Sequence, residues 1–239
     1  MSRRLLLSVL TAAVAVIAGC DLGSGAEDSA GGHHQATARR AELPPGRLVE
    51  RLGHGGYVVA LRHAATDPTT TDTTGDPYDC ARQRNLNAEG RHQARRIGGA
   101  FRRLGIPVGQ VLASPLCRTR QTARLAFGRV RPSRALLSGG FFGEGDGAGR
   151  QRARFRRLLD RPPRRGTDTV LVSHGSAIDA ATGVSVREGE AVIVGPGRQR
   201  FHVIGTIEAA AWVRAERRKG DADHGQVGPA ALRSDGQAR

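Results

Sequence analysis

The stretch Val58–Asp67, VVALRHAATD, decides the fold prediction because it turns from apolar to polar within one strand length. Its first four residues, Val58 to Leu61, have the uninterrupted apolar character of a strand that is buried on both faces. Arg62 and His63 follow directly. Ligands of open α/β sheets bind beyond the carboxyl ends of the strands, so a cation and an imidazole at this point indicate a ligand site.

Strand and helix patterns alternate around this stretch. Short apolar runs predict strands over 56–63, 108–115, 168–175, 189–197 and 199–207. Apolar residues at helical spacing predict helices over 87–105, 117–128, 147–160 and 176–183. Such alternation is typical of a sheet that is covered on both faces. We therefore expect an α/β fold, a three-layer sandwich with a mostly parallel central sheet and helices on both faces.

Two further polar segments follow predicted strands. The segment SPLCRTRQTA (114–123) carries Arg118, and SHG (173–175) carries His174. If these strands are parallel neighbours of the first, their ends converge on Arg62–His63. Guanidinium groups bind phosphate oxygens through paired hydrogen bonds, and imidazole can attack phosphorus as a nucleophile. The sequence therefore predicts a pocket for a phosphoryl group, and no Cys/His spacing suggests a metal site.

The motifs LRHA, SPLCRTRQTA and VLVSHG, in this order, resemble those of the histidine phosphatase superfamily, the phosphoglycerate mutase-like group. RNLNAEGRHQA (84–94) and GEAVIV (189–194) resemble two further segments of that family. The resemblance implies a phosphoglycerate mutase-like fold and hydrolysis of a phosphomonoester through phosphohistidine, with no metal and no organic cofactor. It makes His63 the nucleophile. The residues implied to hold the phosphate are Arg62, Arg118 and His174.

The resemblance leaves the proton donor open. One branch of the family uses a Glu some way after the Ser-Pro-Leu motif, which implies Glu144, with Asp146 as the nearby competitor. The other branch uses an Asp directly after the second His, where this chain has Gly175. The chain also departs from the family at Ala64, where the family has Gly, and we expect this methyl group to be tolerated. The alternative is a non-catalytic anion-binding lipoprotein on the same fold.

The segment 65–85 is longer and more polar than a minimal loop. It can form a rim over the pocket, with Gln83, Arg84 and Asn85 facing the substrate, or it can be an ordinary solvated loop. We expect a disulfide between Cys80 and Cys117, which would pin this loop to the wall of the pocket. The alternative is that both cysteines are unpaired small apolar residues.

The N-terminus predicts export. Arg3 and Arg4 precede an apolar run of fourteen residues, 5–18, which suits the core of a signal peptide better than a membrane span. The run ends in IAGC, which resembles a bacterial lipobox and implies lipidation of Cys20; the alternative is an ordinary secretory signal. We expect a signal peptide over 1–19, a flexible tether over 20–45, the catalytic domain over 46–215 and a disordered basic tail over 216–239. The predicted location is the bacterial cell envelope, with a lipid anchor in the membrane.

The formal net charge is +15, from 37 basic and 22 acidic residues. The basic residues are scattered along the chain and no aromatic residues alternate with them, so we expect no nucleic-acid partner. A basic protein that binds acidic polymers through charge alone stays an alternative. The expected partner is a small phosphorylated substrate or a phosphoprotein; phosphorylated sugars and envelope glycans are also open.

Overall fold

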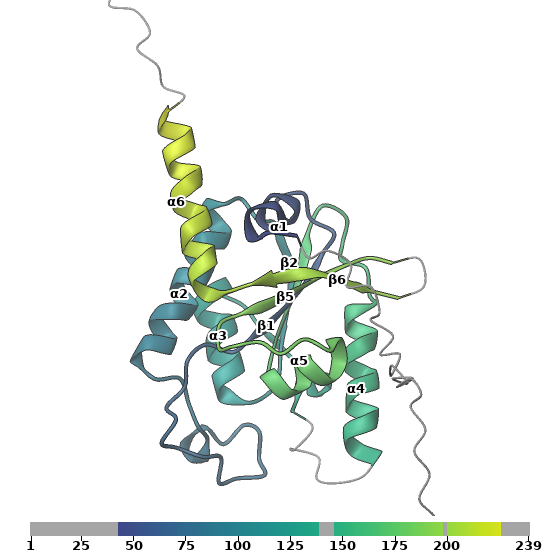
Figure 1. Ribbon diagram of the computed structural model, residues 1–239. Coiled ribbons are helices and arrows are strands. Elements are labelled where there is room, and N and C mark those ends of the chain that lie inside the picture. The colour runs from purple at the N-terminus through teal and green to yellow at the C-terminus, as the bar shows by residue number, and fades with distance from the viewer. Residues whose placement is uncertain (1–42, 139–145, 198–199, 226–239) are drawn as a thin grey trace, which may run out of the picture. The chain divides into compact units, whose positions relative to one another are not determined.

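A computed structural model describes residues 43–138, 146–197 and 200–225, and it contains the expected mixed α/β architecture (Figure 1). Six strands form one sheet in the order β3-β2-β4-β1-β5-β6. Their bounds are β1 Val58–Arg62, β2 Val108–Ala113, β3 Arg131–Pro132, β4 Asp168–Ser173, β5 Ala191–Gly195 and β6 His202–Ile207. The pairs β3–β2, β2–β4 and β4–β1 are parallel, whereas β1–β5 and β5–β6 are antiparallel. Strand β5 alone therefore runs against the others, and the sheet is mostly parallel, as expected.

Helices cover both faces of this sheet (Figure 1). The α-helices are α1 Pro45–Leu52, α2 Ala88–Arg103, α3 Cys117–Phe127, α4 Asp146–Leu159, α5 Gly175–Thr182 and α6 Ala209–Gly225, and the two short 3-10 helices are η1 Cys80–Arg82 and η2 Arg134–Leu136. Apolar side chains of α1, α2, α3 and α6 share one core cluster with the sheet, and those of α4 and α5 share the other. No helix in these described ranges has the length and apolar character needed to cross a membrane.

The side chains of β1 point alternately into two core clusters, one on each face of the sheet. Val59 and Leu61 pack into the cluster beneath α1, α2, α3 and α6, whereas Val58 and Ala60 pack into the cluster beneath α4 and α5. Successive strand residues point to opposite faces, so a strand between two helical layers must be apolar at every position. This requirement explains why the quoted stretch is apolar without interruption until Arg62.

Two local features seat the loop after β1 against α2. The Asn87 side chain caps α2 by accepting a hydrogen bond from the backbone N–H of Gly90, at 2.7 Å. A Cβ atom at Gly90 would lie 1.8 Å from the carbonyl oxygen of Ala65, so only glycine permits this approach. The chain directly after His63 is thereby held close to the start of α2.

The structure corrects one expected boundary. We expected a disordered tail from residue 216, but α6 continues to Gly225. Trp212 and Ala215 are buried against the core, and Glu216 forms an ion pair with Arg103 of α2. The charged composition of this segment concealed a helix, because only its inner face needs to be apolar. The expected signal peptide and Cys20 lie outside the described residues, as do most of the tether and the last part of the tail.

Candidate active site

The topology brings the predicted polar segments together. Arg62 pairs with Ser173 in the parallel β1–β4 register, and Ala113 of β2 pairs with Val172 of β4. The residues that follow these three strands therefore meet at one edge of the sheet. They line a cavity of about 350 Å³ together with residues of neighbouring loops and of α5. Its lining comprises Arg62, His63, Arg84, Arg118, Ser138, His174, Gly175, Ser176, Asp179, Ser185 and Val186.

His63 is suited to be a neutral nucleophile. Its side chain is buried, and its Nδ1 lies 2.9 Å from the carbonyl oxygen of Ala64. A carbonyl oxygen only accepts, so Nδ1 carries the proton and Nε2 keeps a lone pair. Burial, together with the nearby Arg118 and Arg62 guanidinium groups, lowers the pKa of His63 to about 3. The imidazole is therefore uncharged at neutral pH.

His174 lies next to His63 and lines the same cavity. The two rings lie edge to face with their centroids 5.5 Å apart. The Nε2 atom of His174 lies 2.9 Å from Oγ of Ser114, the residue that follows β2. Burial lowers the pKa of His174, and the neighbouring His63 and Arg118 contribute in the same direction. Both imidazoles are thus held neutral by burial, and His174 can act as a hydrogen-bond partner for a bound group.

Two guanidinium groups are anchored but keep donors. Arg62 donates from Nη1 to the carbonyl oxygen of Val186 at 2.9 Å. Arg118 donates from Nη1 and Nη2 to the Asp72 carboxylate at 2.9 and 3.0 Å. In each of the two arginines, Nε is buried and has no hydrogen-bond partner within the described part of the chain. Buried donors are nearly always paired, so two orphaned N–H groups beside one cavity indicate a place for an anion.

The segment 83–85 behaves differently from what we expected. Arg84 lines the cavity, but neither Gln83 nor Asn85 does so. Gln83 accepts a hydrogen bond from the backbone N–H of Cys117 at 2.8 Å. Asn85 donates to the carbonyl oxygens of Cys80 and Gln83. Successive side chains of an extended segment point in opposite directions, so Arg84 faces the cavity while its two neighbours hold the loop together.

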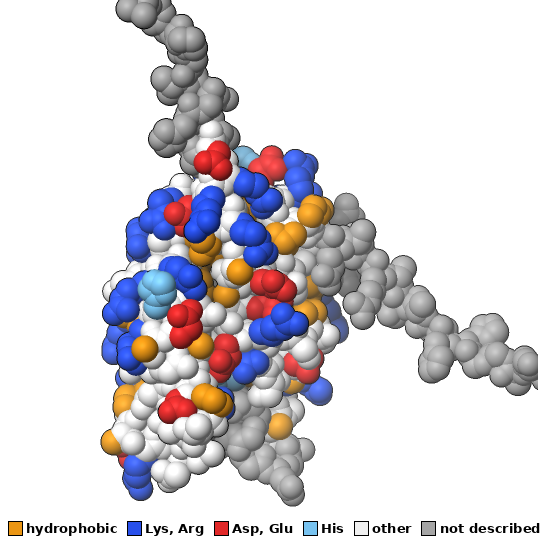
Figure 2. Space-filling view, turned by 60° about the vertical axis from the view of Figure 1, so that its left-hand side comes forward, with side chains coloured by type: hydrophobic (Ala, Val, Ile, Leu, Met, Phe, Trp, Pro, Cys, Tyr) orange, Lys and Arg blue, Asp and Glu red, His pale blue; other side chains and the backbone are white. Residues whose placement is uncertain are grey.

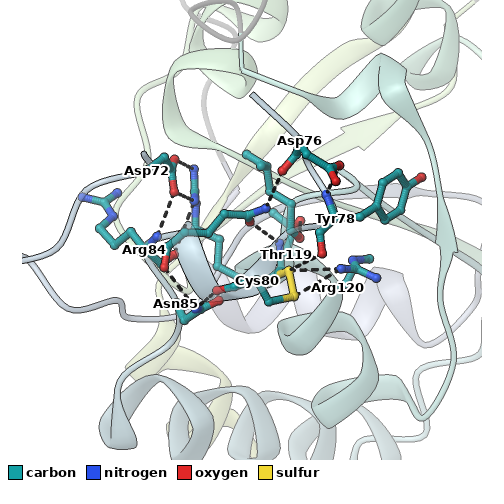
Figure 3. Close-up of a disulfide and its surroundings, with 12 residues drawn as sticks. Asp72, Asp76, Tyr78, Cys80, Arg84, Asn85, Thr119 and Arg120 are labelled. Atoms are coloured by element: carbon teal, nitrogen blue, oxygen red, sulfur yellow. Dashed lines mark hydrogen bonds and ion pairs between the residues drawn. A yellow bond between two sulfur atoms is a disulfide. The ribbon is translucent and has the colours of Figure 1, made fainter. Parts of the chain in front are cut away.

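The structure contains the expected disulfide between Cys80 and Cys117, with Cα atoms 5.6 Å apart (Figure 3). It joins η1, within the long loop, to the first residue of α3. Arg118 is the next residue of that helix. The disulfide therefore ties the loop to the element that carries one of the two phosphate-binding candidates.

Several carboxylates near the site were not anticipated. Glu188 lies 3.8 Å from Nη2 of Arg62 and 3.9 Å from Nδ1 of His63, and it accepts a 2.7 Å hydrogen bond from the hydroxyl of Thr66. Asp179 lines the cavity from α5. Glu188 had a detectable signal in the sequence: an antiparallel strand begins at the edge where its parallel neighbours end, and Glu188 precedes β5.

The side chains of the two predicted proton donors are not among those that the structure describes. Glu144 lies outside the described residues, and only the backbone of Asp146, the first residue of α4, is described. Within the described residues, no group of three or more His, Cys, Asp or Glu side chains is arranged to hold a metal ion.

Part of the chain is similar to known proteins. The family model of the histidine phosphatase superfamily (branch 1) matches residues 58–136, which contain Arg62, His63 and Arg118. No curated protein matches the chain. Solved structures with a similar fold include a phosphoserine phosphatase mutant from Entamoeba histolytica in complex with phosphoserine, with 12% identity over 65% of this chain and 98% of that chain, and a TM-score of 0.48.

Two other solved structures are similar at the same level. A putative alpha-ribazole-5'-P phosphatase from Escherichia coli has 16% identity over 65% of this chain and 98% of that chain, with a TM-score of 0.49. A phosphoglycerate mutase from Thermus thermophilus has 23% identity over 63% of this chain and 98% of that chain, with a TM-score of 0.45. At these identities the likeness does not identify a substrate. The family model of the histidine phosphatase superfamily matches instead the segment that contains His63 and Arg118, and this segment is what the chain shares with that superfamily.

Proposed function

We propose that the chain is a phosphomonoester hydrolase that works through a phosphohistidine intermediate on His63. The observation that carries this proposal is the state of the His63 ring, which is buried and neutral and whose Nδ1 is already paired with Ala64. The lone pair on Nε2 is left for attack on phosphorus. The match of residues 58–136 to the histidine phosphatase family model supports chemistry of the phosphatase or mutase type.

The substrate phosphate binds between Arg62 and Arg118, where the two orphaned Nε–H groups supply charge-assisted donors. Arg84 adds a third guanidinium to the cavity wall. Permanent positive charge in a water-poor site stabilises the extra negative charge of the transition state, which is the main requirement of phosphoryl transfer. His174, held by Ser114 through Nε2, donates to one of the same phosphoryl oxygens.

The reaction has two halves. In the first half, the Nε2 lone pair forms a bond to phosphorus as the bond to the ester oxygen breaks, and the leaving oxygen takes a proton from a carboxylic acid. In the second half, water attacks phosphorus as the bond between phosphorus and Nε2 of His63 breaks, and the same carboxylate accepts a proton from that water. Inorganic phosphate leaves and His63 is neutral again. Glu144 is our first candidate for this acid, Asp146 is the second, and Asp179 is a third on the cavity wall.

We further propose that the protein is exported and lipid-anchored at Cys20, with a small phosphate ester or a phosphoprotein of the cell envelope as substrate. The disulfide supports export because such bonds persist in oxidising compartments. Cell fractionation and incorporation of a labelled fatty acid test the anchor. Wild-type protein should be labelled and pellet with membranes, and Cys20→Ser should be unlabelled.

The activity is tested on a panel of aryl and alkyl phosphate esters in the presence of EDTA. Release of inorganic phosphate by wild type, together with its loss in Arg118→Ala, supports the proposal. Tight binding of phosphate without turnover of any ester would instead support the anion-binding lipoprotein. Transfer of the phosphoryl group to a second hydroxyl of the substrate, with no free phosphate, would indicate a mutase.

The acid is identified by comparing leaving groups. An aryl oxide leaves without much help from a proton, whereas an alkoxide needs one. Loss of the acid should therefore reduce kcat on alkyl esters much more than on aryl esters. We expect this split for Glu144→Gln; finding it in Asp179→Asn or Asp146→Asn would assign the role to that residue.

A further inference from the structure

Asp72, in the long loop after β1, forms a bidentate ion pair with the guanidinium of Arg118. Its two carboxylate oxygens accept from Nη1 and Nη2 at 2.9 and 3.0 Å, which is a two-point contact with the far end of the side chain. Arg118 is almost completely buried, and Asp72 is about one-third exposed. Bidentate contacts of this kind fix the plane of a guanidinium as well as its position.

This ion pair leaves part of the guanidinium without a partner in the described residues. Nε of Arg118 is buried without a partner in the described residues, and Nη2 uses only one of its two protons on Asp72. A guanidinium can bind an oxyanion through its Nη1–Nη2 end or through its Nε–Nη2 side. Asp72 occupies the end, so the side is available for a phosphate. The carboxylate and a phosphate can therefore bind Arg118 together.

The loop itself holds Asp72 in place. The backbone N–H of Arg84 donates to Oδ1 of Asp72 at 2.8 Å, and the carbonyl oxygen of Arg84 lies 3.4 Å from Nη1 of Arg118 (Figure 3). A backbone hydrogen bond from Thr73 to Arg82 closes the loop beside this contact. The Cys80–Cys117 disulfide then joins the loop to α3. Asp72 and Arg118 are thus parts of one cross-linked unit.

We propose that Asp72 is a positioning residue, which holds Arg118 with its Nε–Nη2 side turned to the substrate phosphate. This inference rests on the proposed function and extends it to the long loop, whose role is to brace a phosphate-binding arginine. The competing interpretation is that Asp72 imitates a phosphate and must be displaced before substrate binds. The two interpretations predict opposite signs for the effect of removing the charge of Asp72.

The test compares Asp72→Asn and Asp72→Glu with wild type. The control is Asp79→Asn, which removes a carboxylate of the same loop that pairs with the exposed Arg82 at 2.7 Å. The measurements are KM and kcat on an aryl phosphate, the dissociation constant of inorganic phosphate by calorimetry, and the melting temperature. Phosphate binding is included because it reports on Arg118 even if no ester is turned over.

For Asp72→Asn we expect KM and the phosphate dissociation constant to rise by about 10- to 100-fold, the loss typical of one charged hydrogen bond. The kcat value should fall by less, Asp72→Glu should recover part of the affinity, and Asp79→Asn should match wild type. Unchanged or tighter phosphate binding in Asp72→Asn would overturn the proposal, and tighter binding would favour the displaced-mimic interpretation. If wild type binds phosphate but hydrolyses no ester, the hydrolase proposal fails while these binding results still decide the role of Asp72. If wild type does not bind phosphate, both proposals fail.

Discussion

The imidazole rings of His63 and His174 lie edge to face with their centroids 5.5 Å apart, although the two residues are far apart in the sequence. Their strands, β1 and β4, are parallel neighbours, so the residue that follows each strand reaches the same point of the sheet edge. Each ring is tied down by a single hydrogen bond, from Nδ1 of His63 to Ala64 and between His174 and Ser114.

Replacing His63 by alanine should abolish turnover. The nucleophile is removed, so kcat should fall by about 1000-fold or more. The control is His92→Ala, since His92 is exposed on α2 and lies only near Glu89. Acid-labile, base-stable phosphate should be trapped on the wild-type protein after rapid quenching, and on His92→Ala, but not on His63→Ala. Covalent phosphate on the His63→Ala protein would assign the nucleophile to another residue.

The decline of kcat/KM at low pH should depend on the ionisation of the substrate phosphate rather than on that of His63. Because burial holds the pKa of His63 at about 3, the nucleophile is neutral throughout the range above about pH 4. The second ionisation of a phosphate ester, near pH 6, then decides where kcat/KM declines. Two esters with different second pKa values should give correspondingly shifted limbs. A common limb at the ordinary imidazole pKa of about 6.5 for both esters would contradict this.

Asp168 should make the fold less stable as the pH rises. Its carboxyl group is buried, and this burial raises its pKa to about 7, although it accepts a hydrogen bond from the N–H of Tyr57. The folded state then binds more protons than the unfolded state between about pH 4 and pH 7, so the free energy of unfolding declines across that window. Asp168→Asn keeps an acceptor without the charge and should raise the free energy of unfolding at pH 8 by roughly 1–3 kcal/mol.

The same variant should have little effect at about pH 3, below the folded and the unfolded pKa, where both states of the wild type carry a mostly protonated group. Denaturant unfolding at the two pH values measures the difference. Asp160→Asn is the matched control, because Asp160 also accepts a backbone hydrogen bond, from Phe201, but on the exposed surface. An equal effect of Asp168→Asn at both pH values would show that ionisation is not its cause.

Reduction of the Cys80–Cys117 disulfide should weaken both the fold and the site. The bond closes a loop with a sequence separation of 37, and its loss should lower the free energy of unfolding by about 2–4 kcal/mol. The loop that holds Asp72 is then released, so KM should rise in the same direction as in Asp72→Asn. A reductant should have no further effect on Cys80→Ala. An unchanged KM after complete reduction would show that the loop keeps its position without the bond.

Ala64→Gly should cost stability without improving catalysis. The Ala64 methyl is buried with Leu86 and Ala94, and its backbone N–H donates to the hydroxyl of Thr122. Removing the methyl and adding backbone freedom should lower the free energy of unfolding by about 1 kcal/mol. A clear gain in kcat/KM would instead show that the methyl obstructs the site.

The charge of the surface agrees with the sequence interpretation on the face drawn in Figure 2. Lys and Arg side chains there are scattered among acidic and apolar ones and form no continuous stripe. The basic side chains are therefore spread over this face rather than gathered in one patch. A positive field of this kind attracts small anions in general.

The sequence alone determined the layers, the mostly parallel sheet and the four residues at its edge, because these follow from local patterns. An apolar run that ends in Arg62–His63 must be a buried strand, and buried parallel strands end at a common edge. The helical segment 216–225 escaped prediction because it is charged and carries no apolar pattern of its own; it continues α6, whose buried residues Trp212 and Ala215 come earlier.

Only the tertiary structure decided which way the loop side chains point. Gln83, Arg84 and Asn85 look equivalent in the sequence, yet Arg84 alone lines the cavity. The partners of Asp72 and Glu188 likewise depend on segments that are distant along the chain. The direction in which a loop side chain points depends on the contacts that surround it after folding, and these contacts cannot be predicted from the local sequence pattern.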